Sequence, residues 1–307
     1  MEIQIISGFL GAGKTTFLNQ YLSGLRGKTA VIENEFGDVG LDGELLPGDI
    51  PVREINAGCI CCTLAVDFLE GIVEMIEKFQ PDRILIEPSG VAKLSEIATA
   101  CDRAKRKINF QISKKITIVD VTCCMEYLED FGAFYLDQIL CADTLLLSHI
   151  VEVSEEEKQQ VVCRLKKLNK DAFLYEDDWR TLTSEELLYI LNQKGKGHVV
   201  SADEQQVFLK PIGELANVTL EESGALTEEE LKELLQGLKA EELGFVLRAK
   251  GMVPAADNGF WKFDFTRTSQ TYQKMTHVEK EINRVIIIGC GLKKSNIRNY
   301  IYSFGDD

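Results

Sequence analysis

Short apolar runs alternate with amphipathic stretches along the first 193 residues of the chain. The runs are rich in Val, Ile and Leu, as buried strands are, and the stretches between them repeat apolar residues every three or four positions, as helices do. This alternation predicts an α/β domain whose mostly parallel sheet is covered by helices on both faces. The expected strands cover residues 2–7, 29–35, 51–56, 83–89, 114–120, 144–150 and 172–177, and the expected helices cover 14–25, 64–79, 92–107, 124–140, 154–168 and 183–193.

The pattern changes after residue 193. Residues 194–214 are polar and lack helical periodicity, which predicts a linker. Residues 215–307 then mix strands and helices in an order that predicts a smaller C-terminal α+β domain. The expected elements are strands at 215–222 and 284–289, a hairpin of 245–253 and 259–266, a helix capped by Thr227 and Glu230, and a last helix that runs to residue 304.

The composition is that of a globular protein, with 307 residues of which 45% are hydrophobic and 27% charged. The net charge of −15 would repel phosphates, so we expect no nucleic acid and no anionic membrane as partners. No apolar run reaches the roughly 18 residues of a membrane helix, and the N-terminal stretch lacks a basic region. We therefore expect a cytoplasmic protein, in which nine cysteines favour metal ligands, catalytic thiols or core residues over disulfides.

The segment "GFLGAGKTT" connects the first expected strand to the first expected helix. It has the pattern G-x-x-x-x-G-K-[ST], in which glycines let the backbone fold around phosphates and the helix N-terminus offers free N–H groups. Lys14 would place a cation on the β- and γ-phosphates, and Thr15 would give its hydroxyl to Mg²⁺. The predicted nucleotide-binding residues here are Gly8, Gly11, Ala12, Gly13, Lys14, Thr15 and Thr16.

The segment "RILIEPSG" predicts a second part of the nucleotide site. Its apolar strand ends in Glu87, which would support the Mg²⁺ ion or orient water, and Gly90 would lie near the γ-phosphate. The acidic stretch from Glu33 to Asp38 would complete the site. The candidate catalytic residues are Lys14, Thr15 and Glu87.

Residues 58–62 read "GCICC", which places three thiols within five residues. Thiolates favour Zn²⁺, Cu⁺ or Co²⁺ over Mg²⁺, so a metal site with Cys59, Cys61 and Cys62 would be separate from the magnesium site. One tight cluster leaves coordination positions open, which suits metal transfer better than a structural role. The alternative is a group of buried or redox-active thiols without metal.

Several of these segments together resemble the CobW-like family of P-loop GTPases, relatives of the nickel-insertion GTPases of hydrogenase and urease. The resemblance rests on "GFLGAGKTT", "VIENEFGDVGLDGELL", "INAGCICCTL", "IEPSGVAKL", "VLRAKGMV" and "IIIGCGL". It implies a P-loop GTPase domain over 1–193 that acts with GTP, Mg²⁺ and Zn²⁺ or Co²⁺, and a C-terminal module over 215–307 that binds a partner. The resemblance also implies that Glu33, Asp38 and Cys61 lie near the transferred metal.

The base-reading segment departs from the pattern of GTPases. Ser148, His149, Ile150 and Val151 stand where GTPases carry Asn-Lys-x-Asp. The missing aspartate normally accepts hydrogen bonds from guanine, and valine accepts none, so the choice between GTP and ATP is open. Two hypotheses follow: Glu152 replaces the aspartate, and His149 stacks on the base.

The remaining cysteines and histidines have simpler interpretations. Cys123 and Cys124 are expected to pack in the core, the alternative being a second thiol site near the nucleotide. The chain lacks a histidine-rich tract, which favours metal delivery over storage. Cys101, Cys141, Cys163 and Cys290 are expected in the core, and His198 and His277 at the surface.

The leading hypothesis is a Mg²⁺-dependent nucleoside triphosphatase that delivers a thiophilic metal to a client metalloprotein or cofactor-assembly protein. One alternative is a nucleotide-gated binding protein with little turnover, which regulates assembly of a metalloenzyme or corrinoid cofactor. Another is an ATP-dependent small-molecule kinase, which leaves the cysteine cluster unexplained. Assembly into a homo-oligomer is left open.

Overall fold

The computed structural model describes residues 1–35, 50–56, 64–105, 108–193, 215–267, 269–276 and 283–305. The chain divides into two compact units, Met1–Lys210 and Pro211–Asp307. The linker predicted at 194–214, the three cysteines of "GCICC", Asp38, His198 and His277 lie outside the described residues.

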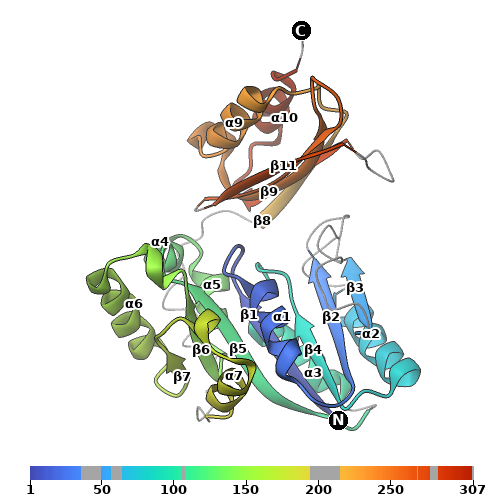
Figure 1. Ribbon diagram of the computed structural model, residues 1–307, viewed down its shortest axis with the longest axis vertical. Helices are drawn as coiled ribbons and strands as arrows, with labels where there is room; N and C mark the ends of the chain where they lie inside the picture. The colour runs from blue at the N-terminus through green and yellow to red at the C-terminus, as the bar shows by residue number, and fades with distance from the viewer. Residues whose placement is uncertain are drawn as a thin grey trace. The chain divides into compact units, whose positions relative to one another are not determined.

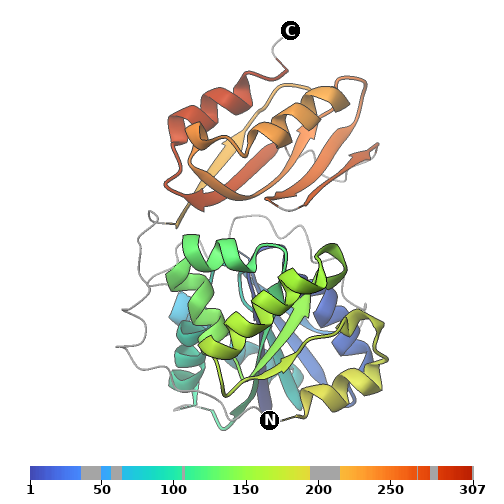
Figure 2. The ribbon, with the colours of Figure 1, turned by 90° about the vertical axis from the view of Figure 1, so that its left-hand side faces the viewer.

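The first unit is built on a seven-stranded sheet with the strand order β3-β2-β4-β1-β5-β6-β7, shown in Figures 1 and 2. Every neighbouring pair in this sheet is parallel. The predicted α/β fold is therefore confirmed. The strands are β1 (Glu2–Gly8), β2 (Thr29–Glu35), β3 (Val52–Asn56), β4 (Arg83–Glu87), β5 (Gln111–Asp120), β6 (Thr144–Ser148) and β7 (Phe173–Tyr175).

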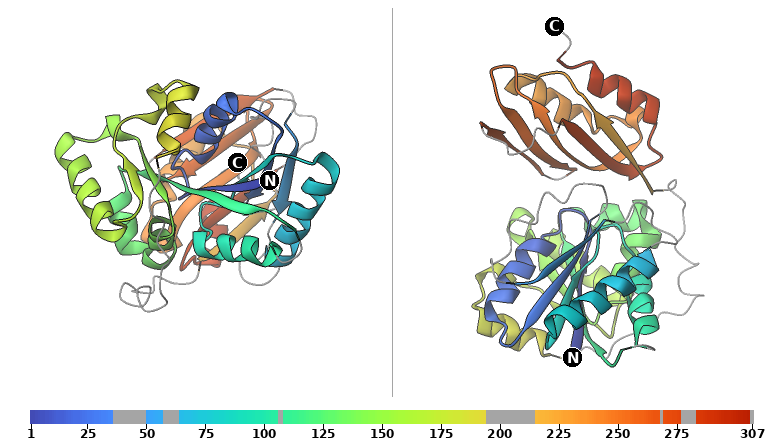
Figure 3. Two further views of the ribbon diagram at one scale, coloured as in Figure 1. Left: turned by 90° about the horizontal axis from the view of Figure 1, so that it is seen from below. Right: turned by 90° about the vertical axis from the view of Figure 1, so that its right-hand side faces the viewer.

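Helices cover both faces of this sheet, because its central strands are apolar on both sides. In the left view of Figure 3, α1 and α7 lie on one face and α2 and α3 on the other. Phe17, Leu18 and Tyr21 of α1 are buried in the core beneath it, as the periodicity of residues 14–25 predicts. The helices are α1 (Lys14–Gly24), α2 (Leu64–Phe79), α3 (Leu94–Ala104), α4 (Cys124–Asp130), α5 (Gly132–Leu140), α6 (Glu155–Leu168) and α7 (Ser184–Leu191), with short 3₁₀ turns η1 (Ile150–Glu152) and η2 (Trp179–Thr181).

The prediction of one continuous helix over residues 124–140 is wrong. Residues 124–140 form α4 and α5, which meet at Phe131, a residue with non-helical dihedrals (φ −117°, ψ 23°). Gly132 follows it, and glycine favours helix poorly. The break lets Phe131 and Tyr135 both pack against Phe9, at ring-centroid distances of 5.3 and 5.4 Å. Tertiary packing thus overrides the local periodicity.

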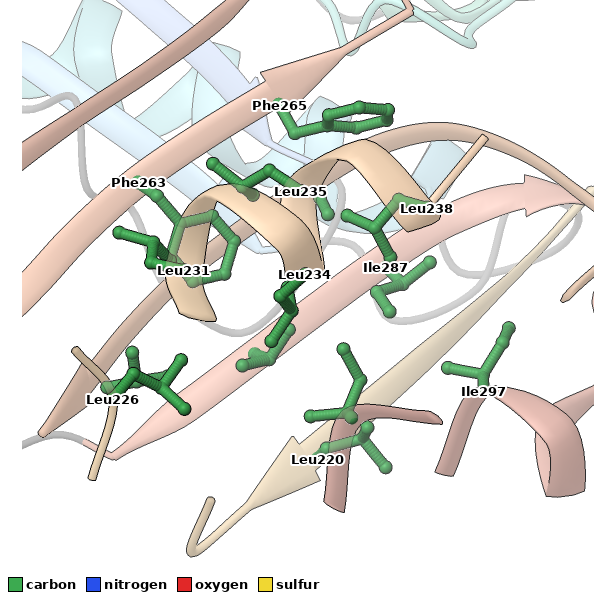
Figure 4. Close-up of a cluster of buried hydrophobic side chains, with 14 of the residues drawn as sticks. Leu220, Leu226, Leu231, Leu234, Leu235, Leu238, Phe263, Phe265, Ile287 and Ile297 are labelled. Atoms are coloured by element: carbon green, nitrogen blue, oxygen red, sulfur yellow. The ribbon is translucent and has the colours of Figure 1, made fainter. Parts of the chain in front are cut away.

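The second unit contains a five-stranded antiparallel sheet with the order β11-β10-β9-β12-β8. Figure 4 shows leucines of α9 directed at the apolar side chains of this sheet, such as Phe263 and Ile287. The predicted hairpin turns at Asn258 and Gly259, whose positive φ values (93° and 86°) suit these two residue types. The elements are β8 (Leu215–Glu221), α9 (Glu228–Gly237), η3 (Glu241–Leu243), β9 (Phe245–Pro254), β10 (Phe260–Thr266), β11 (Gln270–Met275), β12 (Arg284–Cys290) and α10 (Lys294–Tyr302).

The sequence pattern missed β11 because its side chains are mostly exposed and carry no apolar alternation. The hydroxyl–carboxylate caps, in contrast, are recognisable from the sequence. Thr227 and Glu230 form the predicted capping box of α9, and equivalent boxes begin α6 and α7. Among the described helices, none is long and apolar enough to cross a membrane.

Candidate nucleotide and metal site

The phosphate-binding segment lies between β1 and α1, at the carboxyl edge of the sheet. Gly13 is the N-cap of α1 with φ 94°, and as a glycine it has no side chain that could cap the first N–H groups of the helix. Gly8 packs so closely on β5 that a Cβ atom there would lie 2.6 Å from the Ile118 carbonyl oxygen. Both positions therefore require glycine, and the uncapped helix end offers donors to an anion.

Lys14 is folded back over this loop. Its side chain is buried, and its Nζ donates a hydrogen bond to the Phe9 carbonyl oxygen at 3.3 Å. The ammonium group is thus held inside the turn that surrounds a phosphate in P-loop proteins.

Thr15 and Glu87 meet across the site. The Thr15 Oγ1 donates to Glu87 Oε1 at 2.9 Å, which joins the first turn of α1 to the last residue of β4. Glu33 is the register partner of Glu87 in neighbouring β2; Glu33 is buried, whereas Glu87 is half-buried. Hydroxyl and carboxylate oxygens are the ligands that Mg²⁺ prefers, so this donor set fits that ion.

Gly90 lies against the phosphate-binding loop. A Cβ atom on Gly90 would come within 2.7 Å of the backbone nitrogen of Leu10. The structure thus brings Gly90, Glu87, Thr15 and Lys14 to one edge of the sheet, although they come from two distant segments of the chain.

The segment that the sequence predicts to contact the base follows β6. Ser148 ends this strand, and its buried Oγ has no hydrogen-bond partner in the described part of the chain. His149 adopts a left-handed conformation (φ 59°), and its Nδ1 lies 2.6 Å from Glu152 Oε1. Val151, at the position of the missing aspartate, is 73% exposed. The carboxylate of Glu152 therefore lies directly beside the His149 ring.

Sequence reasoning missed further polar residues around His149. Asp120 ends β5, and its Oδ2 lies 3.9 Å from the His149 Nε2. Asp178 follows β7 and forms two bonds to Arg180, from Nε at 2.8 Å and from Nη2 at 3.0 Å. The hydrogen bond from Arg180 lowers the pKa of Asp178, and His149 also contributes. Asp120 is the last residue of a strand and Asp178 closely follows one, so the rule that ligands bind at the carboxyl ends of parallel strands could have found both.

Aromatic and thiol side chains support the phosphate-binding loop from behind. Phe9 packs against Tyr127, Phe131 and Tyr135, while Cys123 and Cys124 are buried beside them. Burial raises the pKa of Cys124 to about 11 and also raises that of Cys123. These thiols stay protonated at neutral pH, which supports the packing interpretation over a second thiol site.

The single cysteines divide into two groups. Cys101, Cys141 and Cys290 are buried, as expected. The prediction for Cys163 is wrong, because this residue lies on the outer side of α6 and is exposed. Two valines precede it and Leu165 follows two positions later, but the helix turns only these three residues, Val161, Val162 and Leu165, inward.

The proposed thiol ligands lie outside the described residues, and so does Asp38. Within the described ranges no cluster of three or more His, Cys, Asp or Glu residues could hold a metal. The segment before the cysteines, β3, ends at Asn56, which pairs with Glu35 of β2. The strand that precedes "GCICC" thus ends at the same sheet edge as Glu33 and Glu87.

Comparison with known proteins identifies the family of the nucleotide-binding domain. The model of the family "CobW/HypB/UreG, nucleotide-binding domain" matches residues 2–176, more than half of the chain. The zinc chaperone YjiA of Escherichia coli is 28% identical over 274 residues, which cover 82% of this chain and 81% of YjiA. The zinc chaperone CobW of Sinorhizobium sp is 38% identical over 125 residues, which cover 38% of this chain and only 35% of that protein.

Among solved structures, the Zn(II)-bound YjiA GTPase from E. coli is similar over 99% of this chain and 98% of that chain, with 23% identity and a TM-score of 0.42. The family assignment rests on the match to residues 2–176. The chain belongs to the CobW/HypB/UreG family, through its nucleotide-binding domain.

Proposed function

We propose that this protein is a Mg²⁺-dependent GTP hydrolase that couples hydrolysis to the binding and delivery of a zinc-class metal. The observation that carries the proposal is the hydrogen bond from Thr15 to Glu87, which joins the phosphate-binding helix to the end of β4. The relatives CobW and YjiA are named zinc chaperones, and YjiA is also named a GTPase.

Each residue of this edge has a defined task in the proposal. The N–H groups at the start of α1 and the ammonium of Lys14 bind the phosphates. Thr15 and Glu87 hold Mg²⁺, whose charge offsets the negative charge that grows on the phosphate oxygens during hydrolysis. Gly90 lies beside Leu10 and changes its contacts when the γ-phosphate is lost.

The metal to be delivered binds at Cys59, Cys61 and Cys62, with Asp38 and Glu33 as neighbouring oxygen groups. Three clustered thiolates suit Zn²⁺, and Co²⁺ serves as its spectroscopic substitute. Glu33 lies beside Glu87 in the sheet. A change at Glu87 on loss of the γ-phosphate can therefore alter the position of Glu33 and of the acidic segment that follows β2. The recipient is a client metalloprotein or cofactor-assembly protein in the cytoplasm.

A second candidate is a nucleotide-gated binding protein with little turnover. The exposed Val151 favours it, because this base-reading segment lacks the aspartate of guanine-specific hydrolases. Phosphate release over many turnovers, with and without Zn²⁺, separates the two candidates.

The deciding experiment is a Co²⁺ titration of the full chain in excess Mg²⁺, without nucleotide and with a non-hydrolysable GTP or ATP analogue. We expect a thiolate-to-metal absorption band that disappears when Cys59, Cys61 and Cys62 are replaced by serine. The matched control is Cys163→Ser, which removes an exposed thiol and should leave the band intact. A wild-type chain without this band, or with an affinity that ignores nucleotide, would contradict the coupling.

A further inference from the structure

Gln138 of α5 is fully buried and directed at the loop that follows β4. Its Nε2 donates to the Gly90 carbonyl oxygen at 3.0 Å and to the Ala92 carbonyl oxygen at 2.9 Å. Two carbonyls accept from one amide group, so the nitrogen must face the loop and the orientation of the amide is fixed.

This amide is costly to bury. Its Oε1 has no hydrogen-bond partner among the described residues. A buried unsatisfied acceptor destabilises the fold, and a side chain needed only for packing would be apolar. The two donated bonds are therefore the reason for an amide at this position.

The neighbouring residue of α5 holds the other end of the same loop. Asp137 Oδ1 accepts a hydrogen bond from the Ser95 backbone nitrogen at 2.9 Å, in the first turn of α3. Two consecutive residues of α5 thus fix the connection from Gly90 to α3 at both ends.

The same helix also supports the phosphate-binding loop. Tyr135 of α5 packs its ring edge-on against Phe9, and Gly90 itself lies against Leu10. One helix therefore holds both loops that surround the γ-phosphate in the proposed site. The Thr117 hydroxyl ties α5 to β5 by donating to the Gln138 carbonyl oxygen at 2.8 Å.

We propose that Gln138 is a positioning residue for the γ-phosphate step, a role that rests on the proposed nucleotide function. Its two bonds fix the peptide group after Gly90 and hold this glycine beside Leu10, where its N–H can meet the γ-phosphate. Gln138 touches no nucleotide atom. Its loss therefore weakens recognition of the triphosphate while leaving recognition of the diphosphate, which lacks the γ-phosphate, intact.

The test compares Gln138→Met with Thr117→Val in the full chain. The first variant keeps the side-chain length and removes the donor to Gly90. The second removes the neighbouring buried bond to the Gln138 backbone and leaves the amide in place. For Gln138→Met we expect about tenfold weaker binding of a non-hydrolysable GTP analogue and about tenfold lower kcat, with GDP affinity within about twofold of wild type. For Thr117→Val we expect any change in affinity to be the same for the GTP analogue and for GDP.

A third variant protects the test if Gln138→Met fails to fold. Gln138→Glu places a carboxyl group before the two carbonyls, and burial raises its pKa. When protonated, this group donates one bond, so its defect with the GTP analogue should be smaller at pH 6 than at pH 8, a difference absent from wild type. Equal weakening of GDP and GTP analogue, or no weakening, would overturn the role of Gln138. A wild-type chain that binds neither nucleotide would instead overturn the proposed function.

Discussion

Glu33 and Glu87 are direct register partners in the neighbouring parallel strands β2 and β4. Their side chains project to the same face of the sheet, which is the face covered by α1, since Glu87 accepts a hydrogen bond from Thr15. Two carboxylates at adjacent positions repel each other, and a divalent cation bound to them relieves this repulsion. The pair explains why the end of β4 is a suitable place for Mg²⁺.

The first prediction concerns this carboxylate pair. Glu87→Gln keeps the shape of the side chain and its bond from Thr15 but removes the charge. We expect the Mg²⁺ concentration for half-maximal hydrolysis to rise at least about tenfold, because charge-assisted contacts are worth more than neutral ones. Phosphate release measured against Mg²⁺ concentration checks this.

The matched control is Glu77→Gln, an exposed glutamate of α2. It makes the same change in net charge away from the site, so it should leave the Mg²⁺ curve in place. If both variants had the wild-type curve, Glu87 would not take part in binding Mg²⁺.

The second prediction concerns the core of the C-terminal unit. Leu235 of α9 is fully buried over the five-stranded sheet, as Figure 4 shows. Leu235→Ala should destabilise this unit by about 2–5 kcal/mol through lost burial and a cavity. Thermal melting of the full chain should show an earlier transition of this unit, while Glu233→Ala on the exposed face of α9 should melt close to wild type. Equal melting of the two variants would contradict the assigned packing.

The sequence predicts an element correctly where residues close together in the chain determine it, and fails where contacts with distant residues do. The capping box of Thr227 and Glu230 is complete within four residues, so the sequence predicts it at the right position. The break at Phe131 depends on Phe9, more than a hundred residues away, and no local pattern shows it. The strand β11 exists because β10 offers it an edge, although its own side chains are mostly exposed.

The same reasoning applies to the site. Lys14 and Thr15 sit in a short pattern that fixes its own loop, whereas the contact between Thr15 and Glu87 depends on β4 lying next to β1. No sequence pattern indicates a role for Gln138, because a single glutamine in a helix is typical of an exposed position. Only the arrangement of α5 against the Gly90 loop reveals its two hydrogen bonds.

The third prediction concerns thiol reactivity. Burial raises the pKa of Cys101 to about 12 and that of Cys124 to about 11, from an ordinary value of 9.0. The folded protein therefore holds these protons to higher pH than the unfolded chain. Their contribution to stability is complete below pH 9 and is lost progressively as the pH rises from 9 through the folded values of about 11 and about 12. Raising the pH from 7 to 9 should therefore leave both thiols buried and protonated.

Alkylation followed by peptide mass spectrometry checks this. Cys163 is exposed and should be labelled by iodoacetamide in the native protein. Cys101 and Cys124 should stay unlabelled until a denaturant is added, which also serves as the control for their intrinsic reactivity. Native labelling of Cys124 at a rate similar to Cys163 would contradict its burial.

The last prediction concerns the choice between GTP and ATP. Glu152 holds one carboxylate oxygen 2.6 Å from the His149 Nδ1, so the ring and the carboxylate are fixed relative to each other at the end of β6. Guanine presents two adjacent N–H donors, which a carboxylate accepts, whereas adenine presents an acceptor beside its amine. Glu152→Gln should therefore weaken GTP binding about tenfold and leave ATP binding nearly unchanged. Equilibrium titration with fluorescent analogues of both nucleotides measures this difference. Glu156→Gln, an exposed change in the first turn of α6, should alter neither affinity. Equal losses for the two nucleotides would show that Glu152 positions His149 and does not read the base. No loss for either nucleotide would indicate that other polar groups near His149 contact the base. Asp120 and Asp178 would then be the first residues to replace by asparagine.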